Sequence, residues 1–250
     1  MSSVKIKKVL ISQPQPENDK SPYSDIEKQY NLEIVFRKLI KVERIDVKAF
    51  RKLKIDLSRF SALIFTSKNG IDHFFSLAEE LRFTVPDSMK YFCTTEAVAL
   101  YLQKYVQFRK RKIFFGNNNF SDLGDVIKKH KGEKFLFICA EVHQCDIPDF
   151  LSKNKVSFSI APIYRTVSED VSDLDLSAFQ MIVFFSPFGI KSLKENNPEY
   201  VQGNTIFGAF GEKTSRAIEE AGFKLHVKAP APEFPSMAMA MEGFFQNSKK

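Results

Sequence analysis

One pattern of twelve residues occurs twice in the chain. FSALIFTSKNGI runs from Phe60 to Ile71 and FQMIVFFSPFGI runs from Phe179 to Ile190, so a constant 119 residues separate the two copies. Each copy is a continuous apolar run of strand length, then a serine, then a stretch of helical character. Solenoid repeats have periods of about 20 to 50 residues, so this much longer period indicates a duplicated half of the chain. The pattern therefore predicts two similar lobes rather than a stack of small units.

The duplication extends to both sides of this pattern. Residues 89–103 align with residues 205–222, each as a strand followed by a helix. Residues 9–43 align with residues 134–169, each as a strand, a loop, a short helix and a second strand. Continuous apolar strands that alternate with helices are typical of parallel sheets covered on both faces. We therefore predict an α/β protein of two similar lobes, each a parallel sheet flanked by helices.

The bulk composition fits two domains that have cores of their own. The chain has 250 residues, of which 44% are hydrophobic and 27% are charged. This length suits two domains of about 120 residues. No apolar run approaches the ~20 residues of a membrane span, and the start MSSVKIKKVLISQ lacks the long apolar core of a signal peptide. We expect a cytoplasmic protein without a membrane partner.

The net charge of +7 favours an anionic partner. Such a partner could be nucleic acid, an anionic lipid or a polycarboxylate metabolite. The densest basic clusters are RKRK at residues 109–112 and KKHK at residues 128–131, and clusters of this kind are most often solvated surface. Because no nucleic-acid-binding motif accompanies them, we expect no nucleic-acid partner.

Motifs for metals and nucleotide cofactors are missing. Cys93, Cys139 and Cys145 form no CxxC pair, and the four histidines form neither HxxxH nor HExxH. Neither GxGxxG nor GxxxxGKS/T follows a predicted strand. We therefore expect no metal, no cofactor, and thiols that are kept reduced.

Ligands of an open parallel sheet bind at the carboxyl ends of its strands, in the loops that lead into helices. The repeat locates these loops, because an apolar strand ends before Ser67 in one copy and before Ser186 in the other. Both serines are expected as helix N-caps, with Pro187 at the first helical position. Backbone N–H groups at helix starts suit carboxylates, and the helix dipoles add to the attraction. A serine here is more often only a cap, but its presence in both copies favours a shared ligand.

Candidate binding residues follow from these loops, whereas catalytic residues are harder to find. The predicted substrate-binding residues are Thr66, Ser67, Lys68, Asn69, Gly116, Asn117, Ser186, Pro187, Gly189, Gly211 and Thr214. No Ser-His-Asp or Cys-His arrangement can be assembled, and no pair of carboxylates stands at the strand ends. Tyr164, in the predicted strand IAPIYRTV, is the proton donor that stands out, although a tyrosine in a strand more often packs in a core.

Several segments, taken in their order, resemble the uroporphyrinogen-III synthase family. They are IFTS at residues 64–67, IYRT at 163–166, FFSPFG at 184–189, FGEKTSRAIEEAG at 210–222 and KAPAP at 228–232. None is highly specific by itself, but their order and spacing together are, and the resemblance covers essentially the whole chain. The sequence looks most like the version of the family found in the Bacteroidetes group of bacteria.

The resemblance implies a particular division of the chain. Family members have two α/β lobes joined by two antiparallel linking strands. Here, residues 1–36 plus 167–250 would form a discontinuous lobe, residues 45–157 a continuous lobe, and residues 37–44 and 158–166 the linking strands. Tyr164 would lie on a linking strand and face the cleft, which makes it the catalytic candidate.

The resemblance also implies a reaction. The family cyclises hydroxymethylbilane, a linear tetrapyrrole with eight carboxylates, to uroporphyrinogen III in haem biosynthesis, with inversion of ring D and loss of water. The family enzyme is a lyase without a cofactor. The implied partner is a small polycarboxylate, which agrees with a basic chain, and we expect a monomer.

Four positions depart from the family pattern. Asn69 stands where an arginine is common, Thr94 and Ala97 where a glycine and a threonine are common, and Ala140 begins a segment that usually contains glycine. These departures keep one alternative open, a non-catalytic tetrapyrrole-binding or regulatory protein on the same duplicated scaffold.

Overall fold

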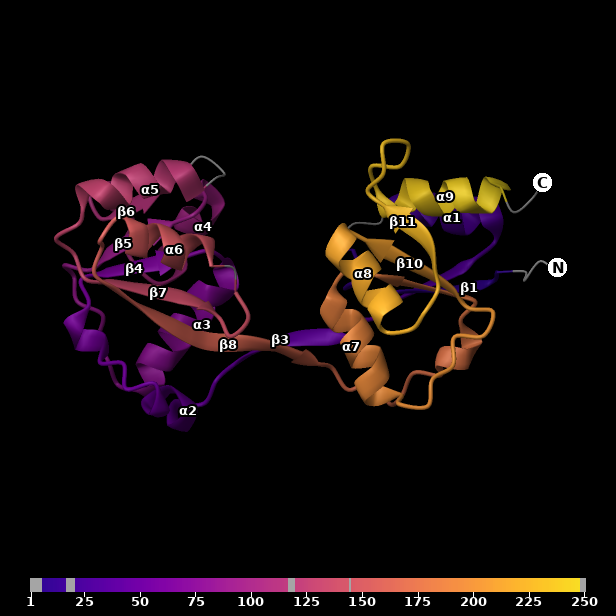
Figure 1. Ribbon diagram of the computed structural model, residues 1–250, viewed down its shortest axis with the longest axis horizontal. Coiled ribbons are helices and arrows are strands. Elements are labelled where there is room, and N and C mark those ends of the chain that lie inside the picture. Colours follow the sequence, from indigo (N-terminus) through magenta and orange to yellow (C-terminus); the bar gives the residue numbers. More distant parts are fainter. Residues whose placement is uncertain (1–5, 17–20, 117–119, 144, 248–250) are drawn as a thin grey trace. The chain divides into compact units, whose positions relative to one another are not determined.

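The computed structural model describes residues 6–16, 21–116, 120–143 and 145–247 (Figure 1). The chain divides into two compact units, which we call unit 1 (Met1–Lys41 with Val167–Lys250) and unit 2 (Val42–Thr166). Each unit is built on one sheet of mainly parallel strands that buries apolar side chains on both of its faces. The predicted α/β class is therefore confirmed.

Unit 1 holds a five-stranded sheet. Its elements are β1 (Lys8–Ile11), α1 (Pro22–Tyr30), β2 (Glu33–Phe36), the 3₁₀ turn η3 (Leu176–Ala178), β9 (Met181–Phe184), α7 (Pro187–Asn196), β10 (Ile206–Phe210), α8 (Glu212–Glu220), β11 (Leu225–Ala229) and α9 (Met237–Asn247). The strand order is β11-β10-β9-β1-β2, and all the neighbouring strands are parallel. Val9 and Ile11 point to the face covered by α1 and α9, whereas Leu10 points to the face covered by α7 and α8.

Unit 2 holds the second sheet. Its elements are β3 (Ile40–Arg44), α2 (Val47–Lys52), the 3₁₀ turn η1 (Leu57–Arg59), β4 (Ala62–Phe65), α3 (Lys68–Glu80), β5 (Lys90–Cys93), α4 (Glu96–Tyr101), the 3₁₀ turn η2 (Leu102–Lys104), β6 (Ile113–Phe115), α5 (Phe120–Lys129), β7 (Phe135–Ala140), α6 (Asp146–Lys153) and β8 (Phe158–Ser168). Strands β3 and β8 each continue a short way past the boundary into unit 1. Leu63 and Phe65 pack against α3, whereas Ala62 and Ile64 face the opposite core with α5 and α6.

The six strands of this sheet have the order β3-β8-β7-β4-β5-β6. Strands β4 to β8 pair in parallel, with an irregular register where Cys139 and Ala140 meet β8. Strand β3 runs antiparallel to β8, because Ile45 donates to the carbonyl of Ile163 while Glu169 donates to the carbonyl of Leu39. Figure 1 shows β8 as a long strand that lies beside β7 first and beside β3 afterwards.

The two units repeat one topology, as the sequence predicts. The order β2-β1-β9-β10-β11 in unit 1 corresponds, strand by strand, to β8-β7-β4-β5-β6 in unit 2. The two units are also alike in the turns that precede β4 and β9. Asp56 and Asp175 each cap a 3₁₀ turn, and each accepts a 3.0 Å hydrogen bond from the N–H of the serine two residues on.

The folding units are not the two sequence copies. In unit 1, the β1-α1-β2 segment of the first copy packs beside the β9-to-β11 segment of the second copy. In unit 2, the β4-to-β6 segment of the first copy packs beside the β7-α6-β8 segment of the second. Each unit thus combines parts of both copies.

Candidate functional site

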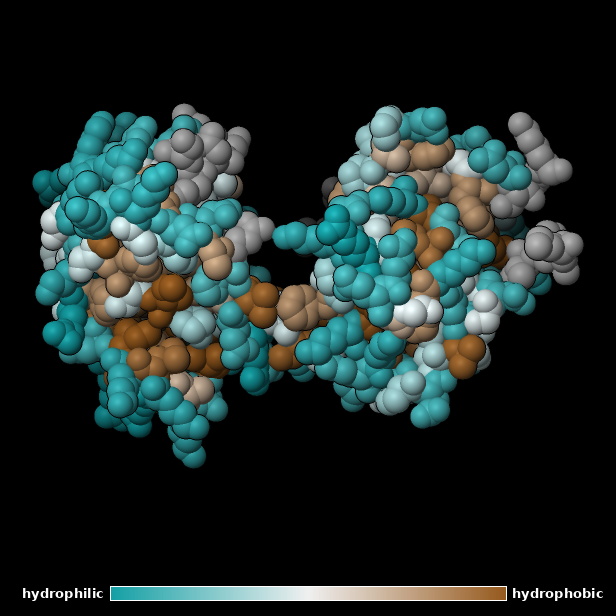
Figure 2. All heavy atoms as spheres, viewed as in Figure 1, coloured by the Kyte–Doolittle hydropathy of each residue, from teal (hydrophilic) through white to brown (hydrophobic). Residues whose placement is uncertain are grey.

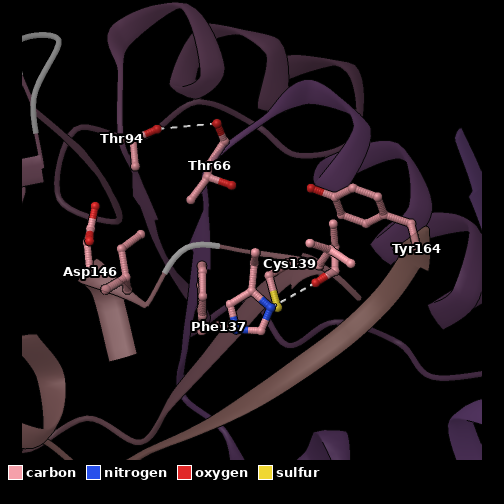
Figure 3. A pocket seen from close by; sticks show the side chains of 10 residues that line it. Thr66, Thr94, Phe137, Cys139, Asp146 and Tyr164 are labelled. Atoms are coloured by element: carbon pink, nitrogen blue, oxygen red, sulfur yellow. Dashed lines mark hydrogen bonds between the residues drawn. The ribbon is translucent and has the colours of Figure 1, made fainter. Parts of the chain in front are cut away.

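A cavity of about 380 Å³ opens at the carboxyl ends of the unit 2 strands. Figure 3 shows the side chains that line it, from β7, β8, the start of α6 and the loops after β4, β5 and β7. The lining residues are Thr66, Thr94, Phe137, Cys139, Ala140, Val142, His143, Asp146, Ile147 and Tyr164. This is the edge at which open parallel sheets bind their ligands, so the cavity is the candidate site of unit 2.

Tyr164 is held in this cavity by Ser67. The two hydroxyl oxygens lie 3.1 Å apart, and either of them can be the donor. Ser67 also accepts a 3.1 Å hydrogen bond from the N–H of Gly70 and so caps α3. The Tyr164 side chain is 8% exposed, and its oxygen points toward Thr66 and the cavity (Figure 3). A mostly buried ring with an oriented hydroxyl can donate a proton to a ligand in the cavity.

His73, on α3, lies against the same tyrosine. The two ring centroids are 5.4 Å apart with planes inclined by 33°. Burial lowers the pKa of His73, the charge of Asp72 opposes this shift, and the charge of Arg44 adds to it. The imidazole is therefore neutral at neutral pH and packs beside the phenol as an uncharged ring.

Two other side chains of the cavity, Cys139 and His143, are limited in the reactions that they can take part in. Burial raises the pKa of the Cys139 thiol to about 12, so this thiol is protonated at neutral pH and is no nucleophile. The Nδ1 atom of His143 donates to the carbonyl oxygen of Ala140 over 3.0 Å, as the dashed line in Figure 3 marks. Tyr164 is thus the lining group best placed to give a proton.

Of the binding residues predicted in unit 2, Thr66 lines the cavity. Ser67 does not line it but contacts the hydroxyl of Tyr164, which does. Lys68 and Asn69 are exposed in the first turn of α3, and the Lys68 ammonium lies 5.3 Å above the Tyr101 ring. Gly116 is buried after β6, where its N–H donates to the carbonyl of Cys93 over 3.2 Å. Asn117 lies outside the described residues.

The binding residues predicted in unit 1 stand at the carboxyl end of its sheet. Ser186 is the N-cap of α7, accepting from the N–H of Phe188 over 3.2 Å, and Pro187 takes the first helical position, as predicted. Gly189 is buried over the ring of Phe184. Gly211, with φ +89°, is the N-cap of α8.

Thr214 lies in the interior of unit 1. It is on the third position of α8 and is 3% exposed, buried in unit 1. Its role as a ligand contact stays a prediction, as it does for the buried Gly116 and Gly189.

Several lining residues escaped the sequence analysis as binding candidates. Cys139, His143, Asp146 and Ile147 follow or end β7, the strand next to β4 in the sheet. The sequence did contain an indication of these residues, because the loop after β7 also follows a predicted strand at its carboxyl end. The loop was not chosen because it lacks the serine or glycine that marks the other loops.

Within the described residues, no group of three or more histidines, cysteines, aspartates and glutamates is arranged to hold a metal ion. None of the helices in that part of the chain has the length and apolar character that a membrane crossing requires.

Comparison with known proteins relates the whole chain to one family. Residues 23–239 match the family model described as "Uroporphyrinogen-III synthase HemD". The structure of uroporphyrinogen-III synthetase from Helicobacter pylori 26695 is similar, with 17% identity, a TM-score of 0.56, and coverage of 97% of this chain and 100% of that chain. A mutant uroporphyrinogen III synthase from the extremely thermophilic bacterium Thermus thermophilus gives 12% identity, a TM-score of 0.51, and coverage of 98% and 100%. No curated protein matches the sequence significantly. At such identities, the structural likeness supports the fold.

Proposed function

The chain belongs to the uroporphyrinogen-III synthase family, and from this premise we propose that it cyclises hydroxymethylbilane to uroporphyrinogen III, with inversion of ring D and loss of water. The match to the family model over residues 23–239 carries this proposal. The reaction is a step of tetrapyrrole biosynthesis and needs no cofactor. We place it in the cytoplasm and assign it to a monomer.

The cavity of unit 2 suits part of such a substrate. Its volume of about 380 Å³ is at the low end of the range of ligand pockets, about 300 to 1,000 Å³. It therefore takes a substituted pyrrole ring rather than a whole linear tetrapyrrole. Its walls are mostly apolar, with Thr66, Thr94 and Tyr164 supplying hydroxyl groups. An apolar wall suits the pyrrole ring, and the hydroxyl groups suit its carboxylates.

Tyr164 is the proposed proton donor. Its phenol gives a proton to the hydroxyl group that leaves hydroxymethylbilane, so the carbon–oxygen bond breaks and water departs. The resulting azafulvene is attacked by ring D, and a spiro intermediate rearranges to the inverted ring. The proton lost when the pyrrole of ring D regains its aromaticity restores the phenol. The 3.1 Å contact with Ser67 supports this role, because it fixes the direction of the phenol.

Backbone N–H groups are the proposed carboxylate contacts. The first turn of α3, with Lys68 and Asn69, offers such groups in unit 2, and the first turn of α7 offers them in unit 1. Gly116, Gly189 and Gly211 stay proposed contacts on the same reasoning. The proposed division into lobes 1–36 plus 167–250 and 45–157, with linking strands 37–44 and 158–166, is supported by the two compact units of the chain.

The proposal is tested by supplying freshly made hydroxymethylbilane. The products are oxidised, and isomers I and III are separated by chromatography. Isomer III formed faster than in the blank supports the synthase. Isomer I alone, formed at the blank rate, contradicts it, and tight binding of the bilane without turnover would establish the non-catalytic alternative.

A further inference from the structure

The net positive charge of the protein is confined to unit 2. Residues 1–41 and 167–250 hold 16 lysines and arginines and 16 aspartates and glutamates, so unit 1 is neutral apart from its histidines. The net charge of +7 therefore belongs to residues 42–166. If this positive charge served to bind a substrate rich in carboxylates, it should lie beside the candidate site, at the carboxyl ends of the strands.

The excess lies at the opposite end of the sheet. Because β4 to β8 are parallel, the loops that precede them meet at one edge, which we call the basic edge. Its loops are residues 53–61, 81–89, 105–112, 130–134 and 154–157. They hold ten lysines and arginines against three acidic residues, an excess equal to the net charge of the whole chain. The positive charge thus lies at the end of the sheet opposite the candidate site. The proposed reaction therefore does not account for the position of this charge.

The basic edge contains a groove of about 590 Å³. Lys54, Arg59 and Lys134 line it, all exposed, and among the described residues none of these three cations has an ion-pair partner. The single carboxylate of the groove, Asp56, already accepts from the N–H and the hydroxyl of Ser58 over 3.0 and 2.6 Å. Asp56 also interacts electrostatically with Arg59, so the groove has three positive charges against one negative charge.

Part of the groove, which we call its floor, is lined by apolar side chains, some of them from β8. Phe158, Ile160 and Pro162 line it from the strand, and Leu53 and Ile55 line it from the facing loop. Leu53 is 39% exposed. Figure 2, in the same view as Figure 1, shows hydrophobic side chains gathered along β8 with hydrophilic ones around them.

The backbone of β8 is unpaired on this side. The N–H of Phe135 on β7 donates to the carbonyl of Ser157, so residues 157, 159 and 161 bond toward β7, and Phe158 and Ile160 direct their N–H and C=O groups outward. Strand β3 covers the outer side only from about Ile163 onward, where Ile45 donates to its carbonyl. Within the described residues, the first half of β8 is therefore an open strand edge that faces the groove.

We propose that this groove binds an extended acidic segment of a partner protein, which pairs its backbone with the open edge of β8. Strand addition uses main-chain hydrogen bonds for affinity and places alternate side chains in the groove. Carboxylates of the segment pair with Lys54, Arg59 and Lys134, and its apolar side chains cover the floor. An open strand edge over an apolar floor fits a peptide, whereas a nucleic acid has no backbone to pair with a strand. The proposal is independent of the reaction at the other end of the sheet.

The test uses a fluorescein-labelled peptide of about eight residues in which glutamate and valine alternate. Fluorescence anisotropy with the full chain should show saturable binding, weakened about tenfold or more when salt is raised to about 0.5 M. A peptide in which lysine replaces glutamate should not bind. A glutamate–valine peptide with N-methyl groups on alternate residues keeps the charges but cannot form the ladder, and it should also lose binding.

A charge-reversed protein locates the site. The double variant Arg59→Glu with Lys134→Glu should bind the peptide about tenfold more weakly or worse. Lys28→Glu, at an exposed position on α1 in unit 1, reverses a charge away from the basic edge and should change binding little. Formation of isomer III by both proteins should be unchanged, which separates this site from the proposed reaction.

Three outcomes would overturn the proposal. The first is equal binding of the N-methylated peptide, and the second is equal loss of binding in Lys28→Glu. The third is failure to bind the peptide while single-stranded DNA or anionic phosphatidylserine vesicles bind with the same dependence on Arg59 and Lys134, which would assign the basic edge to a nucleic acid or a lipid surface.

Discussion

Tyr164 belongs both to the core of unit 2 and to the cavity at which we propose the reaction. Its ring is almost fully buried, beside the neutral imidazole of His73, and its hydroxyl contacts Ser67. A tyrosine in a strand is ordinarily a packing residue, and this ring does pack in the core of unit 2. The hydroxyl, in contrast, lines the cavity. Packing of the ring therefore fixes the position of the hydroxyl group that we propose as the proton donor.

Removing the hydroxyl group tests this role. Tyr164→Phe keeps the ring and its packing, so stability should fall by no more than about 1 kcal/mol, the net value of one hydrogen bond. Formation of isomer III should fall about 10²-fold or more, the usual scale for a general acid. Initial rates with isomer separation, together with urea unfolding, measure both effects. A folded variant of normal activity would remove Tyr164 from the mechanism.

The duplication supplies a matched pair for the contact with Ser67. Ser67→Ala and Ser186→Ala each remove the N-cap of an equivalent helix, at a cost of about 1 kcal/mol. Only Ser67→Ala also removes the hydroxyl beside Tyr164. We expect Ser67→Ala to lose up to about 1 kcal/mol more stability than Ser186→Ala, because it also removes the hydrogen bond to Tyr164, and to lose clearly more activity. Equal loss of activity in the two variants would show that Ser67 acts only as a cap.

At the scale of elements, one carboxylate fastens α3 to the turn that follows α4. Asp72 accepts hydrogen bonds from the hydroxyl groups of Tyr101, at 2.8 Å, and of Tyr105, and from the Lys104 ammonium, at 3.1 Å. Burial alone would raise the pKa of Asp72, but the hydrogen bonds from Tyr105, Tyr101 and Lys104 outweigh it, so the pKa is lowered. Ser67 caps the same helix and contacts Tyr164, so this network also helps to hold α3 in place beside the site.

The lowered pKa of Asp72 has a consequence for stability. The carboxylate stabilises the fold fully above its unfolded pKa of about 4, and this contribution is lost as the pH falls through the lower, folded pKa. Asp72→Asn should lower the free energy of unfolding at pH 7 by about 1 kcal/mol, a value at the low end because the side chain is partly exposed. Urea unfolding across the acid range should show the two proteins converging as the pH falls. Glu79→Gln, on the exposed face of the same helix, is the control, and a difference that persists below the folded pKa would contradict the assignment.

At the scale of the whole molecule, the units differ in how they use the chain. Unit 2 is one continuous segment with apolar cores on both faces of its sheet. Unit 1 needs both ends of the chain, because β1 lies between β9 and β2 in its sheet. Unit 1 is therefore complete only when both ends of the chain are present, whereas unit 2 needs only residues 42–166.

This difference predicts the behaviour of fragments. The segment 42–166 should fold by itself and unfold cooperatively in urea, because all strands and helices of its cores are present. The segment 167–250 should not, because it lacks β1, β2 and α1, which cover one face and one side of its sheet. Circular dichroism and urea titration of the two fragments check this. A stable fold of residues 167–250 alone would contradict the account.

Local features of the fold were predictable from the sequence, and so was part of the site. Ser67, Ser186 and Pro187 cap their helices as predicted, because a cap depends on a few neighbouring residues. Thr66 was found as a cavity residue by its position after a strand. Burial of Thr214 was not foreseen, because the exposure of one position on a helix depends on what packs against that helix.

The sequence by itself determined the elements and their duplication, because apolar runs, caps and repeats are written in neighbouring residues. Only the tertiary structure decided which segments pack together, because strand pairing joins residues far apart in the chain. It combines parts of both copies in each unit, and it brings Ser67 to Tyr164 across 97 residues. It also gathers the positive charge of five separate loops at one edge of a parallel sheet, whereas composition alone indicated only an anionic partner and no location for the charge.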